Sequence, residues 1–581
     1  MVQELTKGRL QKHAEPWASL CAMALHTNDP ARLVRNGAGA EAVIGNPPEG
    51  SLDSPDPLRV RPPFAAVTLD RRQRRLTLAS DPFGLHPVYY AAEGESLVFC
   101  TKLNPLLRSG LVDWSFDPAA LVDFFTYEHV TGHRTFADGV RVLPPGTVLQ
   151  FHDGRVTLTP YREWRFGTSE RGDRARVADR LFEALRAAVA RSFEPGQRVA
   201  VTLSGGLDSR ALLGCAVSVG GCRLRTYTFG THGCPDVTLA RRLARVCGVP
   251  NVTVHTDGRY LQRWIDHGVY VTGGMVNCIH YHILSLAATL RVEADVVLEG
   301  LGGDALTGGH LRPGMRHVGS KDALARAVYR LRATAWPTRR VLASILRPEV
   351  MDATRYDPHD AVRPHFEAPA IRCAWMGCHH FDLDERQRRF IQYGPHLLRP
   401  LVNVQTPFYD PEVTAILSEL PASEMAGQLA YLAMHRRCLP ALAQVPDALR
   451  GLPVSWPDSV RLGKRVFDAG RRRLPGPVRR LLGGSSDLPT DYAGWLRGQL
   501  RNLVVDRLLD PRTPLADYVQ LPEARRLVDQ HINGSSDHTT KIGCLLTFDA
   551  WLRSLKASQQ CEVTSHAELP PDAWIELKCH E

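Results

Sequence analysis

The 581-residue sequence contains no hydrophobic run that approaches the length of a membrane span. Its first segment also lacks the apolar stretch of a signal peptide, because it carries Glu4, Lys7, Arg9, Lys12 and Glu15. The thirteen cysteines form no Cys-x-x-Cys pair, which disfavours both a zinc site and a disulfide framework. From these absences we expect a cytoplasmic protein with no membrane contact.

Lysine is scarce, so arginine supplies almost all the positive charge behind the formal net charge of +10. The densest basic segment spans residues 461–480, and aromatic residues do not alternate with its arginines. This pattern favours a solvated helix face and argues against nucleic-acid binding. The alternative is that the segment binds an anionic substrate, a leader peptide or a partner protein.

The most informative stretch is residues 199–209, with the sequence Val-Ala-Val-Thr-Leu-Ser-Gly-Gly-Leu-Asp-Ser. It predicts a buried strand, a glycine turn and a helix that begins near Arg210. The small residues Ser204, Gly205 and Gly206 let backbone N–H groups approach an anion, and the helix dipole favours the same spot. Asp208 would repel phosphate, so we expect it to be a Mg²⁺ ligand. The pattern is typical of the pyrophosphate loop of enzymes that cleave ATP between its α- and β-phosphates.

The residues that follow predict a parallel, doubly wound sheet. We expect strands at 225–230 and 252–255, a helix at 236–246, and a fourth strand from residue 295 that ends in a second glycine-rich loop. That loop carries Asp304. Because nucleotides bind at the carboxyl ends of such strands, Asp208 and Asp304 are expected to share a Mg²⁺–pyrophosphate unit.

Three segments here resemble the asparagine synthetase family, which includes β-lactam synthetases and lasso-peptide cyclases. They are residues 204–209, residues 298–309 (similar to its Gly-x-Gly-x-Asp-x-x-x-Gly-Gly loop) and residues 406–410 (similar to its Arg-x-Pro-Phe-Leu-Asp). The resemblance implies an AMP-forming amide ligase that uses ATP and Mg²⁺, with Asp208, Asp304 and Lys464 as catalytic residues. The ATP and pyrophosphate ligands that we expect are Leu203, Ser204, Gly205, Gly206, Leu207, Asp208, Ser209, Phe229, Gly300 and Gly302.

Segments 64–70, 81–90 and 143–146 resemble the end of the family's glutaminase domain, which is of the N-terminal-nucleophile (Ntn) type. In glutamine-dependent members the mature chain begins with Cys, whose amino group serves as the base for its thiol. Here residue 2 is Val, and Cys21 would become terminal only after cleavage. We therefore expect a degenerate domain without glutaminase activity, in which Cys21 is a small core residue.

A second departure from the family pattern lies three residues before Asp304. Ammonia-using members carry Glu there and β-lactam synthetases carry Tyr, whereas this chain has Leu301. Glu299 is near, but we expect it to point in a different direction from the strand. The other candidates for an acceptor-side base are His280, His282 and Tyr393, for each of which a structural role is favoured.

The sequence thus predicts an α/β protein in three parts: a β-rich Ntn-type glutaminase-like domain at 1–165, a doubly wound ATP-pyrophosphatase domain with helical additions at 175–480, and a helical extension at 488–556. We expect it to adenylate a small-molecule or peptide carboxylate for attack by an amine. Two alternatives stay open: intramolecular ring closure, as in lasso-peptide cyclases or β-lactam synthetases, and a non-catalytic relict ATP-binding protein.

Overall fold

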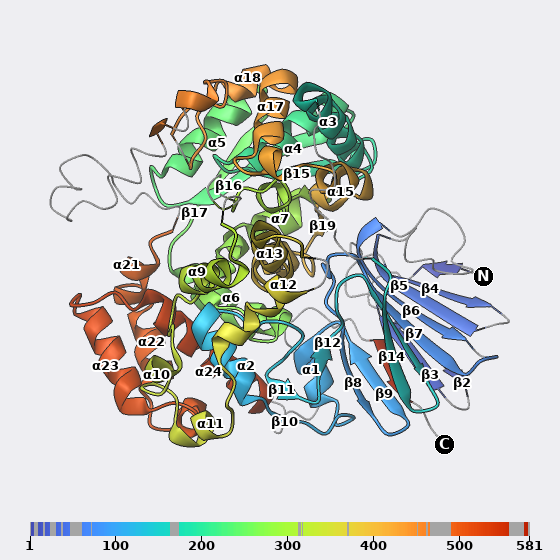
Figure 1. The fold of residues 1–581 in the computed structure, drawn as a ribbon, viewed down its shortest axis with the longest axis vertical. Coiled ribbons are helices and arrows are strands. Elements are labelled where there is room, and N and C mark those ends of the chain that lie inside the picture. Colours follow the sequence, from blue (N-terminus) through green and yellow to red (C-terminus); the bar gives the residue numbers. More distant parts are fainter. Residues whose placement is uncertain are drawn as a thin grey trace.

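Figure 1 shows the fold of the computed structural model. Backbone and side chains are described for residues 61–70, 72–162, 173–311, 318–368, 371–449, 451–460 and 490–556, and for Met315, Gly463 and Lys464. Strands between residues 2 and 46, and the strand at 575–578, are described by their backbone alone. The basic segment 461–480 otherwise lies outside the described residues. Within the described part, no helix combines the length and apolar character needed to cross a bilayer.

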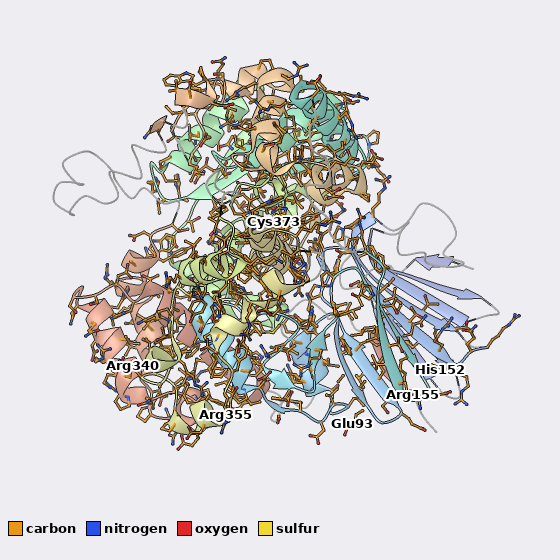
Figure 2. All side chains as sticks on the ribbon, viewed as in Figure 1. Glu93, His152, Arg155, Arg340, Arg355 and Cys373 are labelled. Carbon is orange, nitrogen blue, oxygen red and sulfur yellow. The ribbon has the colours of Figure 1, made fainter. Side chains whose placement is uncertain are left out.

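The amino-terminal region is built mainly from antiparallel strands, drawn in blue to teal in Figure 1. Its largest sheet has the order β1-β4-β5-β6-β7-β13-β14. Strand β13 shows why these residues form a sheet: Thr147, Leu149 and Phe151 are buried, whereas the intervening side chains are half-buried or exposed. Figure 2 places the exposed His152 and Arg155 at the tip of the β13–β14 hairpin. The strands are β1 (Val2–Glu4), β4 (Ala31–Asn36), β5 (Gly39–Asn46), β6 (Arg61–Asp70), β7 (Arg75–Ser80), β13 (Thr147–His152) and β14 (Arg155–Pro160).

Three smaller sheets complete this region. Two of them have the orders β12-β8-β9 and β2-β3-β20, and β10 pairs with β11. Their strands are β8 (Tyr89–Glu93), β9 (Ser96–Cys100), β12 (Arg141–Val142), β2 (Leu10–Glu15), β3 (Ala18–Met23), β20 (Ile575–Lys578), β10 (Ser115–Phe116) and β11 (Ala137–Asp138). Two helices belong to the same part of the chain, α1 (Leu103–Arg108) and α2 (Pro118–Tyr127).

A five-stranded parallel sheet forms the centre of the second part, with the order β17-β16-β15-β18-β19. Its first strand along the chain, β15, is central, so the connections run in opposite directions on its two sides. This places a topological switch point between β15 and β18, where open α/β sheets bind ligands. The strands are β15 (Arg198–Thr202), β16 (Arg223–Gly230), β17 (Asn251–His255), β18 (Val296–Leu298) and β19 (Asn403–Gln405).

Each face of the parallel sheet packs on its own core. Val199 and Val201 belong to the core formed with α3, α4, α5, α15 and α17, whereas Ala200 belongs to the core formed with α6, α7 and α14. Burial on both faces explains why this strand reads as a continuous apolar run. These helices are α3 (Arg174–Ala190), α4 (Leu207–Val219), α5 (Pro235–Val246), α6 (Arg259–Thr272), α7 (Ala287–Glu293), α14 (Tyr393–Leu398), α15 (Pro411–Ser418) and α17 (Leu429–Cys438).

The carboxyl-terminal helices pack into the same core as α1, α2 and α6. They are α21 (Tyr492–Arg497), α22 (Arg501–Leu508), α23 (Leu521–Ile532) and α24 (Thr539–Lys556), at the lower left of Figure 1. The chain breaks between α21 and α22, because Gly498, which follows α21, has φ and ψ of −108° and −94° that are not helical. The N–H of Trp551 on α24 donates to Asn104 on α1 at 3.1 Å, which ties this region to the amino-terminal part.

The remaining helices connect these layers. They are η1 (Cys278–Leu286), α8 (Gly303–Leu306), α9 (Lys321–Arg332), α10 (Arg339–Leu342), α11 (Pro348–Asp352), η3 (Pro358–Ala361), α12 (Pro364–Glu367), α13 (Ala374–Phe381), the π-helix η4 (Asp382–Ile391), η5 (Pro407–Tyr409), α16 (Ala422–Met425), α18 (Pro440–Ala443) and η6 (Pro514–Asp517). The mixed α/β class predicted from the sequence, with a β-rich amino-terminal region and a helical α/β region after it, is confirmed.

Candidate active site

A cavity of about 570 Å³ lies at the carboxyl ends of β15, β16 and β18. The turn after β15 and the loop after β18 both contribute to its wall, and η1, η4 and α14 contribute other parts. The cavity therefore occupies the switch point that the sheet order predicts.

Hydrogen bonds fix the conformation of the turn between β15 and α4, which lies at the cavity. The N–H of Ser204 donates to Oγ of Ser209 at 3.1 Å, and the N–H of Gly205 donates to Oδ1 of Asp236 at 2.8 Å. Gly206, the residue before α4, has no side chain to cap the helix, so no cap side chain accepts from the first N–H groups of α4. The fully buried Arg210 donates to Gly205 O at 3.2 Å and to Pro446 O at 2.7 Å, which fixes the turn against the chain behind it.

Glycines let the two loops approach each other. A Cβ at Gly303 would lie 2.4 Å from Cγ of Asp208, and one at Gly205 would lie 2.8 Å from the side chain of Leu239. Gly302 has a φ of +92°, which is strained for any other residue. Close packing and backbone conformation therefore require glycine within the loops at 204–206 and 300–303.

The approach brings the carboxylates predicted to bind Mg²⁺ together. The N–H of Asp304 donates to Oδ2 of Asp208 at 2.8 Å, and the hydroxyl of Tyr431 donates to Oδ1 of Asp208 at 3.0 Å. Nε2 of Gln428 donates to Oδ1 of Asp304 at 3.1 Å. Burial, together with the neighbouring Asp304 charge, raises the pKa of Asp208, and burial also raises the pKa of Asp304. Asp208 is half-buried and Asp304 is exposed to the cavity, so two neighbouring hard oxygen donors that repel each other remain accessible to a divalent cation such as Mg²⁺.

Most of the residues predicted to bind ATP line the cavity. They are Leu203, Ser204, Asp208, Ser209, Phe229, Gly300 and Gly302, and the predicted metal ligand Asp304 lines it too. Gly205, Gly206 and Leu207 belong to the same turn but are not among the lining residues. Lys464 is half-buried and likewise does not line the cavity within the described residues, whereas Arg386, on the π-helix, does. The sequence pattern did not indicate Arg386, Tyr431 or Gln428, because none of them lies in a motif that points to this site.

Glu299 and Leu301 both line the cavity, which corrects the expectation that Glu299 points elsewhere. The strand β18 ends at Leu298, so strict alternation no longer applies to the two residues that follow. Oε2 of Glu299 accepts the N–H of Leu301 at 2.7 Å. Burial raises the pKa of Glu299 to about 6, although this hydrogen bond and the charge of Arg399 oppose the shift.

The other three candidate bases also lie at the cavity, each with a different partner. His280 is paired with Glu128 at 2.9 Å. Nδ1 of His282 is hydrogen-bonded to the hydroxyl of Tyr492, and burial lowers the pKa of His282 to about 3. The hydroxyl of Tyr393 lies 3.2 Å from that of Tyr89.

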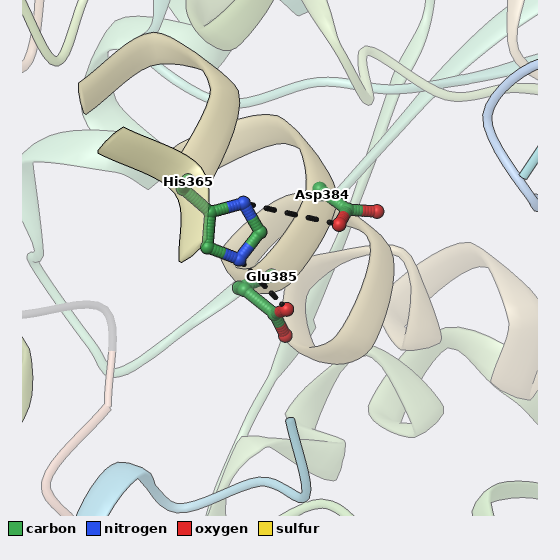
Figure 3. Close-up of side chains that lie close together, drawn as sticks. All are labelled: His365, Asp384 and Glu385. Carbon is green, nitrogen blue, oxygen red and sulfur yellow. Dashed lines mark hydrogen bonds and ion pairs between the residues drawn. The ribbon is translucent and has the colours of Figure 1, made fainter. Parts of the chain in front are cut away.

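A polar cluster lies beside the cavity, between the π-helix η4 and the helix α12, which carries His365 (Figure 3). Its three members His365, Asp384 and Glu385 are close enough together to hold a metal ion. Each already has a partner, however: Nε2 of His365 lies 3.1 Å from Glu385, and Arg388 contacts Asp384 at 2.9 Å. Oε2 of Glu385 also accepts the N–H of Gly132 at 2.7 Å. The charges balance without a metal, and the cluster ties the π-helix to the amino-terminal part.

Replacing Glu385 with Gln is expected to destabilise the protein. The hydrogen bond from His365 lowers the pKa of Glu385 despite its burial, so the ionised form stabilises the fold at neutral pH and this contribution is lost as the solution is acidified. Loss of the charged partner should cost about 1–3 kcal/mol, measured as a lower melting temperature at pH 7. The exposed Glu367→Gln serves as the control, and an equal melting temperature for the two variants would contradict the role of this cluster.

Comparison with known proteins identifies the family. The asparagine synthase family model matches residues 180–447, and the glutamine amidotransferase domain model matches residues 58–162. A protein of Mycobacterium bovis named "putative asparagine synthetase", glutamine-hydrolyzing, is 25% identical in an alignment of length 537 that covers 85% of this chain and 76% of that protein. The glutamine-hydrolyzing asparagine synthetase 1 of Bacillus subtilis is 24% identical over 43% of this chain and 40% of its own length. The carboxyethyl-arginine β-lactam synthase of Streptomyces clavuligerus is 27% identical over 42% of this chain and 46% of its own length. The chain belongs to the asparagine synthetase family.

Proposed function

We propose that this protein is an ATP-dependent amide ligase that forms AMP and pyrophosphate and has no glutaminase activity of its own. The observation that supports this proposal most is the closeness of Asp208 and Asp304. The backbone N–H of Asp304 donates to Oδ2 of Asp208 at 2.8 Å, beside the start of α4, which has no side-chain cap. An anion-binding helix start and two adjacent carboxylates are what a metal–pyrophosphate leaving group requires. The membership of the family supports the ligase class.

In the proposed first step, an oxygen of the substrate carboxylate attacks the α-phosphorus of ATP, and the bond to the bridging oxygen breaks. Pyrophosphate leaves with the bonding electrons toward the turn at 204–209, where the N–H groups at the start of α4 would bind it. Asp208 and Asp304 would hold Mg²⁺, which supplies positive charge to the phosphate oxygens. The product of this step is an acyl-adenylate, which an amine then attacks to form the amide.

The leaving pyrophosphate also needs a protein cation. Lys464 stays our sequence-based candidate, and its neighbours 465–489 lie outside the described residues. Arg386 is the second candidate, because it is the one arginine or lysine among the described residues that line the cavity. Its guanidinium would offset the charge that develops on the phosphates.

We further propose that the chain divides functionally into an amidotransferase-like part at 1–165, a synthetase part at 175–480 and a helical extension at 488–556. A leader peptide or partner protein that binds the basic segment 461–480 belongs to the same proposal.

The test is ATP–pyrophosphate exchange with the full chain, screened over a library of carboxylic acids with MgCl₂. Exchange that depends on one acid, with AMP as the nucleotide product, is the expected result. ADP and phosphate as products would overturn the proposal. ATP binding without exchange for any acid would instead favour the relict ATP-binding protein.

Intramolecular ring closure is the second candidate. The observation in its favour is Leu301, which replaces the polar residue of ammonia-using members, together with the similarity to a β-lactam synthase. In this version the amine belongs to the same molecule as the activated carboxylate. Mass spectrometry of the product separates the outcomes, because ring closure loses one water from a single substrate.

Ammonium is expected to be a poor nitrogen donor. The buried Leu301 cannot relay a proton or stabilise ammonium, but it can pack against an amine that arrives already positioned, which gains effective molarity. Aspartate and ammonium chloride with MgATP should therefore yield little asparagine by amino-acid analysis. The comparison reaction uses the acid from the exchange screen with an organic amine. If asparagine formed as fast as the product of that comparison reaction, the proposal that Leu301 makes ammonium a poor nitrogen donor would be wrong.

A further inference from the structure

Glu128 and His280 form a pair at the cavity wall, although they are far apart in the sequence. Nε2 of His280 lies 2.9 Å from Oε2 of Glu128, and His280 lines the cavity. Because an ionised carboxylate only accepts hydrogen bonds, Nε2 carries the proton in the neutral ring and Nδ1 keeps its lone pair. The structure gives Nδ1 no hydrogen-bond partner among the residues it describes. The hydrogen bond to Glu128 thus fixes the tautomer of the His280 imidazole and leaves Nδ1 available to accept a proton.

Glu128 is itself held firmly. Its Oε1 accepts the hydroxyl of Thr334 at 2.8 Å, and its Oε2 also accepts Nδ2 of Asn277 at 3.0 Å. Its backbone has a φ of +68° directly after α2, an uncommon conformation for a residue other than glycine. The side chain of Glu128 is 11% exposed and that of His280 is 31% exposed, so the carboxylate lies behind the imidazole. The ring of His280 is further fixed by an edge-to-face contact with Phe390, whose centroid is 4.8 Å away.

The other groups at the cavity are less suited to accept a proton. His282 is bonded to Tyr492 at Nδ1, and its pKa of about 3 makes it a weak base. Glu299 uses one oxygen for the N–H of Leu301, and its charge contributes to raising the pKa of Asp208 at the proposed metal end. The hydroxyl of Tyr393 is paired with that of Tyr89.

We propose that His280 is the general base for the acceptor amine and that Glu128 is the residue that positions it. This inference rests on the proposed ligase function. The amine nitrogen attacks the acyl carbon, a C–N bond forms, and the C–O bond to AMP breaks as AMP leaves with its electron pair. One N–H proton passes to Nδ1 of His280 and from there to solvent, while the Glu128 carboxylate stabilises the transient imidazolium.

This arrangement gives the amino-terminal part a role that needs no glutaminase. Glu128 lies in the segment that matches the amidotransferase domain, and His280 lies in the segment that matches the synthetase. The backbones of the two segments also meet at this place, because the N–H of Asn277 donates to the backbone oxygen of Glu128 at 2.9 Å. The acceptor side of the site is therefore complete only with both parts of the chain present.

The experiment compares His280→Gln, Glu128→Gln and the exposed control His232→Gln in the full chain. Pyrophosphate exchange with the acid from the screen reports adenylation and folding. Ethylamine and hydroxylamine are the two acceptor probes: ethylamine is protonated at neutral pH and needs a base, whereas hydroxylamine is largely unprotonated. In His280→Gln, ethylamide formation should fall about a hundredfold or more, with exchange and hydroxamate formation unchanged. Glu128→Gln should show the same split with a loss of about tenfold or more.

Three results would separate the possibilities. Equal ethylamide formation in His280→Gln and the control would overturn the role of His280 while leaving the ligase proposal intact. A parallel loss of exchange, ethylamide and hydroxamate in both His280→Gln and the smaller His280→Asn would show that the residue has a structural role only. No exchange in the unmodified protein with any acid would overturn the ligase function and this inference together.

Discussion

Replacing Asp208 with Asn should lower the pyrophosphate-exchange rate at least about a hundredfold, equivalent to about 2.7 kcal/mol or more of transition-state stabilisation. The amide keeps the shape of the side chain and accepts from the N–H of Asp304, but it removes one charged oxygen from the proposed metal site. Asp304→Asn should have a similar effect. The folded state should not be destabilised in the absence of metal, because the substitution relieves repulsion between two neighbouring carboxylates.

Two measurements accompany this prediction. The control is Asp123→Asn, which removes the charge of a fully buried carboxylate outside the cavity and should leave the exchange rate unchanged. In thermal unfolding, MgCl₂ with pyrophosphate should raise the melting temperature of the unmodified protein and not that of Asp208→Asn. Only the unmodified protein is expected to bind Mg²⁺ together with pyrophosphate. Wild-type exchange in Asp208→Asn would refute the assignment.

Glutamine should yield no glutamate above the background of the assay. A terminal-cysteine glutaminase needs a free α-amino group beside its thiol, and this chain has Val2 in the corresponding region. In the structure Val2 lies in the edge strand β1, opposite Val34. Cys21 lies within β3, whose backbone is paired with Lys12 on one side and Glu576 on the other. Exposing an amino group at Cys21 would remove β1 and β2 and break β3.

The glutamine experiment has its own controls. Cys21→Ala should leave pyrophosphate exchange and amide formation unchanged, because the proposed mechanism makes no use of that thiol. Mass spectrometry of the amino terminus checks that the chain is uncleaved. Release of glutamate from uncleaved chain would contradict this account, whereas release from chain that begins at Cys21 would show that processing creates the nucleophile.

The sequence by itself determined the parallel sheet and the two loops that carry Asp208 and Asp304. These features are encoded locally: an apolar strand, small residues where backbones must approach, and an acid at a fixed offset. The glycine positions show why this works, since a Cβ at Gly303 would lie 2.4 Å from Cγ of Asp208.

The tertiary structure alone decided which distant side chains complete the site. Tyr431 reaches Asp208 across 223 positions, and Glu128 reaches His280 across 152. Neither pair has a local pattern, because each depends on how separate helices and the amino-terminal part pack against the sheet. The cavity position of Glu299 was also mispredicted, since β18 ends one residue earlier and alternation stops there. Local sequence sets loops and strands by short-range sterics, whereas the partners of a buried polar group are set by packing across the whole fold.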